Sequence, residues 1–187
     1  MKKESRGLVL AQKNNITSII DEHYGRICAH SFISLFVGGF YTYSLEKNSA
    51  LYLISYEEIF NEPLEIASHD IFFLHHLFEI TIQCVPLGSY VKDIFLFFAW
   101  LYDQEISFFT KKNKKYVIFR LLSYVDMWPT DPIKYSLLLR ITQIPIDRIN
   151  QETLDLIPDE ILSDWINDDF FNQGLYKKLK TKLFLNL

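Results

Sequence analysis

Ser18-Ile-Ile-Asp-Glu-His-Tyr-Gly-Arg-Ile27 is the stretch that decides the fold of the N-terminal third of this chain. An apolar run meets an acidic turn and a glycine, and a second apolar run follows, which is the pattern of a β-hairpin. Further short runs rich in β-branched and aromatic residues occur at 7–11, 26–36 and 50–56. They predict four or five strands in a small antiparallel barrel or a compact meander.

The barrel is expected to be minimal. Residues 1–61 are few for a closed barrel, so we expect at least one strand to be very short or one hairpin to be missing. Asn61-Glu-Pro63 then begins a different pattern, because proline suits the first turn of a helix and acidic residues are favourable there. We therefore predict a domain boundary at this point, with a β domain at 1–61 and an α-helical domain at 62–187.

Helical patterns account for the rest of the chain. Apolar residues cover most of the circumference of a helix predicted over 68–85, which indicates burial between neighbours. Pro86 and Gly88 end that helix. Further helices are predicted over 89–104, 111–127, 135–141 and 158–165. The predicted fold class is α+β, with a small antiparallel barrel followed by a helical domain.

Composition restricts the class of protein. The chain has 187 residues, of which 49% are hydrophobic, and its formal net charge is −4. This composition excludes a disordered chain, and any nucleic-acid-binding surface must be local rather than a basic domain. Cys28 and Cys84 are the only cysteines, which favours a reducing compartment, and we expect a cytoplasmic protein. The longest apolar run, 94–102, is about half of a membrane span.

No catalytic or metal-binding signature is recognisable. His75 and His76 are adjacent, and neighbouring side chains on a helix point about 100° apart, so they cannot easily share a metal ion. Gly38-Gly39 lacks the lysine of a phosphate-binding loop. We therefore expect no enzyme activity, no cofactor and no metal. An enzyme of unknown type remains the third interpretation.

Two groups of residues are candidates for binding. Basic residues interleaved with tyrosines could neutralise and stack on single-stranded nucleic acid, although barrel cores use aromatic residues too. This group comprises Lys2, Lys3, Arg6, Lys13, Tyr24 and Arg26. A second basic cluster suits an acidic peptide or a phosphate, or is only a solvated loop between helices. It comprises Lys111, Lys112, Lys114, Lys115 and Arg120.

These stretches, read together, resemble the bacterial DNA repair protein RecO family in divergent form, without its zinc-binding cysteines. The resemblance begins at Arg6-Gly-Leu-Val-Leu10 and continues through the hairpin at 18–27. In the helical part it lies in Ile71-Phe-Phe-Leu-His-His-Leu-Phe-Glu79 with Val85-Pro86, Ile94-Phe95, Lys115-Tyr-Val-Ile-Phe-Arg-Leu-Leu122 and Met127-Trp128-Pro129. It covers about residues 5–132.

The resemblance implies an N-terminal OB-fold and a helical C-terminal domain. It also implies binding and annealing of single-stranded DNA, cooperation with RecR, and binding of the acidic tail of single-stranded DNA-binding protein. Lys115 lies where family members carry an arginine that receives this tail, so Lys115 and Lys114 are the main partner-binding candidates. The alternative is a helical protein-protein interaction adaptor that does not bind nucleic acid.

Overall fold

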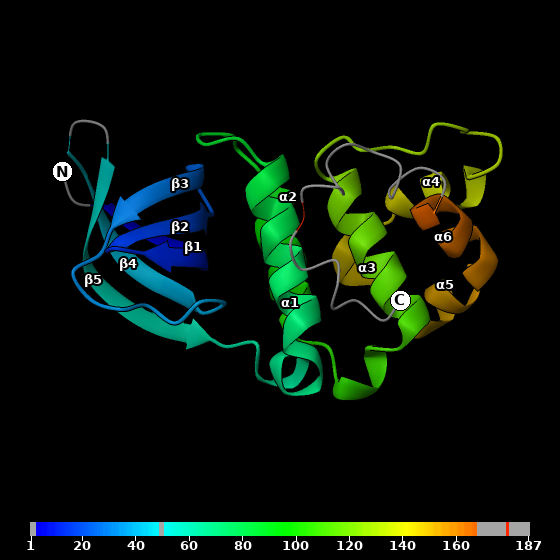
Figure 1. Cartoon of the computed structure of the whole chain (residues 1–187), viewed down its shortest axis with the longest axis horizontal. Coiled ribbons are helices and arrows are strands. Elements are labelled where there is room, and N and C mark those ends of the chain that lie inside the picture. The colour runs from blue at the N-terminus through cyan, green and yellow to red at the C-terminus, as the bar shows by residue number, and fades with distance from the viewer. Residues whose placement is uncertain (1–2, 49–50, 168–178, 180–187) are drawn as a thin grey trace. The chain divides into compact units, whose positions relative to one another are not determined.

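The computed structural model describes residues 3–48, 51–167 and 179 (Figure 1). Strands come first and helices follow, so the predicted α+β class is confirmed. The strands are β1 (Lys3–Lys13), β2 (Ile16–Asp21), β3 (Gly25–His30), β4 (Phe40–Asn48) and β5 (Leu51–Asn61). The helices are α1 (Leu64–Cys84), α2 (Lys92–Tyr102), η1 (Ile106–Phe108), α3 (Lys111–Ser123), α4 (Ser136–Thr142), η2 (Ile146–Arg148), α5 (Gln151–Asp155) and α6 (Asp159–Trp165).

The five strands form an OB-like barrel with the order β1-β2-β3-β5-β4, in which β4 pairs back to β1. Every pairing is antiparallel except the short parallel seam between β3 and β5, where Ala29 lies opposite Tyr52. The expectation that a strand would be very short or a hairpin missing is wrong. β1 and β5 have 11 residues each, and register shifts in β1 and in the β4–β5 pair accompany closure of the barrel within 61 residues.

The hairpin predicted from residues 18–27 is present as β2 and β3. Gly25 has a φ of 69°, and a Cβ at this position would lie 1.7 Å from the carbonyl oxygen of Ser89, so only glycine fits. The preceding β1–β2 turn uses Asn14 and Asn15, with φ of 51° and 62°. Two consecutive residues with positive φ are typical of the tight turn that best matches strand twist.

Two strand predictions need correction. The run at 26–36 forms a strand only to His30, because the chain then crosses the end of the barrel and places Leu35 in its core. β4 was not among the predicted strands. Its signal is the alternation of buried Tyr41, Tyr43 and Leu45 with partly exposed residues between them, which is the period of two expected for a strand with one buried face.

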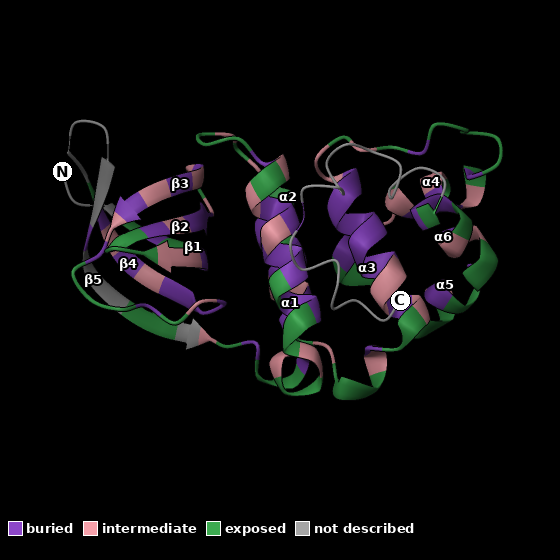
Figure 2. Ribbon diagram, viewed as in Figure 1, coloured by how far each residue is buried: buried purple, intermediate pink, exposed green. Residues whose placement is uncertain are grey.

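The barrel interior combines an apolar core with a buried polar network centred on Asp21. The core contains Val9, Ile19, Ile27, Ala29, Leu35, Tyr41, Tyr43, Leu45 and Ile54, and Figure 2 shows the resulting alternation of buried residues along β3. Asp21 is 1% exposed and accepts hydrogen bonds from Ser5 Oγ and Tyr43 Oη, both at 2.7 Å. The backbone N–H groups of His23 and Tyr24 donate to its other oxygen. Four donors therefore satisfy this buried carboxylate.

A helix covers part of the outer surface of the barrel. Leu8 lies opposite Ile20 on β2 and opposite Phe40 on β4, and all three are buried. The Phe40 ring packs edge-on against Phe95 and Tyr102 of α2, at centroid distances of 5.2 and 5.3 Å. α2 therefore buries this apolar row on the outer surface of the barrel.

The chain forms two compact units, and each unit is built from two separate stretches of the sequence. The first contains residues 1–64 and 81–102, and the second contains 65–80 and 103–187. The boundary expected between residues 61 and 62 marks the change from strands to helices, since β5 ends at Asn61 and α1 begins at Leu64. The packing boundary differs from it because α2 and the end of α1 belong to the barrel unit.

In the second unit, α3 is the most buried helix. Its residues 116–123 are all buried, and the Phe119 ring packs edge-on against Trp165 of α6 at 4.9 Å. Asp70 interrupts the helical backbone of α1 with a φ of −155°. Its side chain accepts from the N–H of Phe73, as an N-cap does, so the helix restarts at this point.

Candidate nucleic-acid interface

The outer surface of the barrel is hollowed where β1, β2 and β3 run side by side. The hollow has a volume of about 340 Å³ and is lined by Ala11, Lys13, Asn14, Ile16, Ser18 and Cys28. The strand register explains this grouping, because Ala11 lies opposite Ser18, which in turn lies opposite Cys28. All six residues lie on the surface that the strands turn away from the core or in the β1–β2 turn.

An aromatic residue extends this surface at one end. His30 is the register partner of Ile16, and its ring centroid lies 5.1 Å from that of Phe32. Phe32 is 75% exposed, and Ile33 beside it is 51% exposed. We call Lys13, Ile16, Ser18, Cys28, His30 and Phe32 the hairpin face.

Hydrogen bonds hold the Phe32 loop in place. Gln12 donates from Nε2 to the carbonyl of Ile33 at 2.9 Å and accepts from the N–H of Leu35 at 2.8 Å. The N–H of Ser31 donates to the carbonyl of Asn15 at 2.9 Å. The exposure of Phe32 is therefore set by an anchored loop, which lowers the conformational entropy lost when a ligand packs on its ring.

The hairpin face carries the kinds of group that proteins use to bind a single strand in a sequence-tolerant way. An exposed aromatic ring offers a stacking platform, and a lysine near it can neutralise a backbone phosphate. Ile16 and Phe32 supply the apolar contacts and Lys13 supplies the charge. These groups are of the kinds that bind a nucleic-acid strand.

The nucleic-acid candidates proposed from sequence occupy different environments. Lys2 and the side chain of Lys3 lie outside the described part of the chain. Arg6 forms an exposed ion pair with Glu22, with Nη2 and Oε2 2.7 Å apart. Tyr24 packs partly buried against the barrel core. Of the four candidates whose side chains are described, Lys13 lies on the hairpin face, and Arg26 donates from Nε to Ser18 Oγ of that face at 3.4 Å.

Arg26 caps a helix. Its Nη1 donates to the carbonyls of Ile82 and Val85, at 2.6 and 2.5 Å, where α1 ends. Partial burial lowers the pKa of its guanidinium. The backbone of Arg26 also exchanges hydrogen bonds with Gly88 and Ser89. The side chain and the backbone of Arg26 thus both attach the segment at the end of α1 to β3.

Sequence reasoning missed Ile16, His30 and Phe32. The available signal was the Asn14-Asn15 turn, which fixes the strand register and so determines which residues share a face. Cys28 and Ser18 follow from the same register. The exposure of Phe32 has no local signal, because an aromatic residue in a loop is equally compatible with the core.

The residues of the basic cluster of α3 differ in whether their charge is already paired. Lys114 pairs with Asp70 at 2.6 Å and lies over the Phe73 ring. Lys115 pairs with Asp159 at 3.0 Å and donates to Ser163 at 2.7 Å. These two lysines each have a side chain only 12% exposed.

Arg120 is 3% exposed and donates to the carbonyls of Ile141, in the last turn of α4, and Ile144, just after it. Lys111 and Lys112, in contrast, form no ion pair with any residue that the structure describes. A partner can therefore bind the charges of these two lysines without breaking an ion pair that the structure describes.

No known protein family and no curated protein matches this chain. Within residues 3–48, 51–167 and 179, no helix is both long and apolar enough to cross a membrane. Over the same residues, no three His, Cys, Asp or Glu side chains are grouped so that they could hold a metal ion. Functional assignment therefore depends on the surfaces described above.

Proposed function

We propose that this protein binds single-stranded DNA through the hairpin face of its barrel and acts as a RecO-like mediator in DNA repair. The observation that supports the proposal is the anchored, exposed Phe32 beside the hollow of an OB-like barrel. Barrels of this class bind oligonucleotides on the surface of strands 2 and 3 and in adjacent loops. Here that surface is open around Lys13 and Ile16.

The physical character of this face sets the expected mode of binding. Stacking of one base on an aromatic side chain contributes roughly 1–3 kcal/mol, and each phosphate contact to a single strand contributes about −0.7 to the slope of log K against log salt. Two described cations lie at the face: Lys13, and Arg26, whose Nε donates to Ser18 Oγ at 3.4 Å but whose Nη1 is already bound to the carbonyls of Ile82 and Val85. Binding is therefore expected to be dominated by stacking, with a shallow dependence on salt.

The partner side of the proposal concerns the helical unit. We place the acidic tail of single-stranded DNA-binding protein at Lys111 and Lys112, whose charges are available, with Lys114, Lys115 and Arg120 holding the helix in position. RecR is the second expected partner. A helical adaptor without DNA affinity is the alternative, and the first experiment distinguishes the two.

Fluorescence anisotropy with a labelled oligothymidine tests DNA binding in the whole protein. Phe32→Ala should lower the affinity about tenfold, because it removes the stacking platform. Tyr90→Ala is the matched control, since Tyr90 is also an exposed aromatic residue of the barrel unit, at 63% exposure, and lies outside the hairpin face. Absence of binding at low salt would support the adaptor, and equal effects of the two variants would exclude the hairpin face.

A further inference from the structure

The hollow of the hairpin face follows from the register of three strands. Ala11, Ser18 and Cys28 lie opposite one another on β1, β2 and β3, with neighbouring Cβ atoms about 4.5–5.5 Å apart. The next row on the same face carries longer side chains, which are those of Lys13, Ile16 and His30. The shorter row therefore lies at the floor of a hollow of about 340 Å³, at the lower end of the range for ligand sites, roughly 300–1,000 Å³. A hollow of this size suits one small planar group.

The Ser18 hydroxyl is available as a donor in this hollow. Arg26 donates from Nε to Ser18 Oγ at 3.4 Å, and Arg26 is itself held by the carbonyls of Ile82 and Val85. Oγ thus accepts from a fixed cation, and its own hydrogen makes no hydrogen bond with a residue that the structure describes. A ligand in the hollow therefore meets an O–H donor.

The groups on the two sides of Ser18 differ in character. Ala11 ends at its methyl group and leaves space above it, whereas Cys28 is a half-buried free thiol whose sulfur is a weak acceptor. From β1 to β3, the row thus presents an apolar niche, a hydrogen-bond donor and a weak acceptor. A planar ligand that fits this row carries a methyl group, an acceptor and a donor in the same order along one edge.

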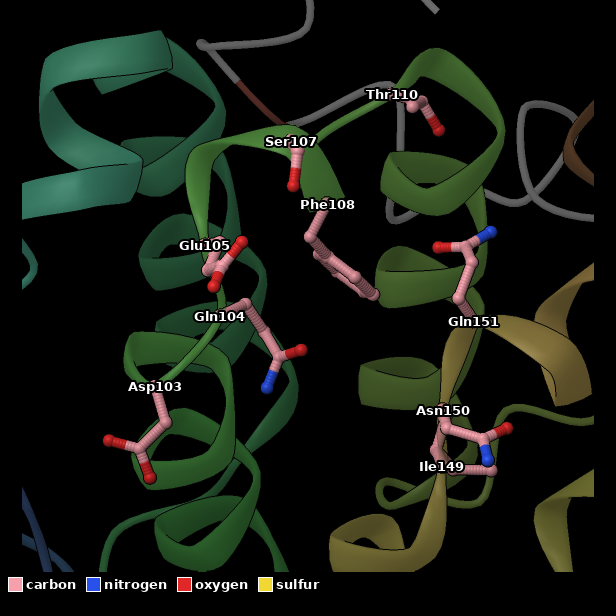
Figure 3. Close-up of a pocket in the computed structure, with 9 residues that line it drawn as sticks. All are labelled: Asp103, Gln104, Glu105, Ser107, Phe108, Thr110, Ile149, Asn150 and Gln151. Atoms are coloured by element: carbon pink, nitrogen blue, oxygen red, sulfur yellow. The ribbon is translucent and has the colours of Figure 1, made fainter.

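Charge distinguishes this hollow from a larger one in the helical unit. The larger hollow, of about 600 Å³, lies between residues 103–110 and 149–151 (Figure 3). Its described lining includes the carboxylates of Asp103 and Glu105 but no lysine or arginine, so it would repel a phosphate. The hollow of the hairpin face is lined by Lys13 and no carboxylate. An anionic strand is therefore matched to the hairpin face.

We propose that the hollow binds one thymine base of the single strand, beside the base that stacks on Phe32. The two positions are neighbours, because Ile16 lines the hollow and lies opposite His30, whose ring contacts that of Phe32. The inference rests on the proposed function and names the base preferred at that site. Stacking on Phe32 remains sequence-tolerant, and the hollow adds the preference.

The edge of thymine matches the row in order. Its C5-methyl group fills the space above Ala11, its O4 accepts from the Ser18 hydroxyl, and its N3–H donates to Cys28 Sγ. Uracil has the same edge without the methyl group and leaves the apolar niche empty. Cytosine places its N4–H₂ donor against the hydrogen of Ser18. Thymine is therefore favoured over both other pyrimidines.

Competition against a labelled oligothymidine, followed by fluorescence anisotropy in the whole protein, tests the preference. Unlabelled strands of thymidine, deoxyuridine and deoxycytidine have the same length and the same phosphate charge. Oligothymidine should bind about fourfold more tightly than oligodeoxyuridine, which is the effect of burying one methyl group. It should bind at least about fivefold more tightly than oligodeoxycytidine, because one hydrogen bond is lost.

Variants of the row assign the preference to the hollow. Ala11→Val fills the niche and should bring the ratio of oligothymidine to oligodeoxyuridine affinity close to one, and valine is favourable in a strand. Ser44→Val is the matched control, since Ser44 lies on β4 opposite Glu4, outside the hairpin face, and this variant should keep the fourfold ratio. Ser18→Ala should narrow the difference between oligothymidine and oligodeoxycytidine. Circular dichroism confirms that each variant is folded.

Phe32→Ala separates the hollow from the stacking position. It should weaken all three strands and leave the fourfold ratio unchanged, because the methyl group is bound above Ala11. A ratio that disappears in Phe32→Ala and survives in Ala11→Val would assign the methyl effect to stacking and overturn the inference. Equal binding of oligothymidine and oligodeoxyuridine by the unmodified protein would also overturn it, while DNA binding by the hairpin face would stand. Absence of binding to every strand would overturn both.

Discussion

His76 is the residue whose ionisation should influence stability most clearly. It is fully buried in α1, and burial lowers its pKa from 6.5 to about 4, against the opposing effect of Glu79. The unfolded chain therefore binds a proton between pH 6.5 and 4 that the folded protein does not. Stability contributed by neutral His76 is present above pH 6.5 and is lost as the pH falls toward 4, by up to about 3 kcal/mol.

Urea denaturation across this pH window tests the effect. His76→Gln should flatten the loss of unfolding free energy between pH 6.5 and 4, because glutamine does not titrate. His75→Gln is the control, since His75 is its exposed neighbour. Carboxylates such as Glu22 and Asp70, whose pKa values are lowered, titrate equally in all three proteins and cancel in the comparison. Parallel pH profiles for the two variants would contradict the assignment.

At the scale of elements, Arg26 joins β3 to the end of α1. Its two hydrogen bonds satisfy carbonyls that a helix end leaves without partners. Arg26→Ala should lower the free energy of unfolding by about 1–3 kcal/mol, because both carbonyls lose a charged donor.

Arg6→Ala is the matched comparison for this prediction. Its ion pair with Glu22 is exposed, and exposed pairs contribute about 0.2–1 kcal/mol. Urea midpoints of the two variants give the difference directly. A loss in Arg26→Ala no larger than in Arg6→Ala would show that the helix cap contributes little to stability.

For the molecule as a whole, the two units interleave along the chain. The barrel unit needs residues 81–102, since α2 covers the buried row Leu8, Ile20 and Phe40. A fragment of residues 1–62 should therefore expose this row and fail to fold cooperatively, whereas residues 1–102 should retain the barrel. Amide NMR dispersion and thermal denaturation of the two fragments test this. Cooperative unfolding of 1–62 with the same midpoint would contradict the assigned packing.

The sequence alone was sufficient where local rules act. The β2–β3 hairpin, the change from strands to helices after Asn61 and the start of α3 at Lys111 all follow from turn residues, caps and hydrophobic period. β4 was overlooked although its alternation is visible. These features depend on neighbours within a few residues, so a linear pattern records them.

Only the tertiary structure decided which charged and aromatic residues are available for binding. Lys114 and Lys115 are each paired with a carboxylate 44 positions away in the sequence, and Arg26 contacts carbonyls 56 and 59 positions away. The exposure of Phe32 and the assignment of α2 to the barrel unit are likewise products of long-range packing. The physical reason is that a side chain's charge and area are local properties, whereas its partner and its burial are set by segments distant in sequence.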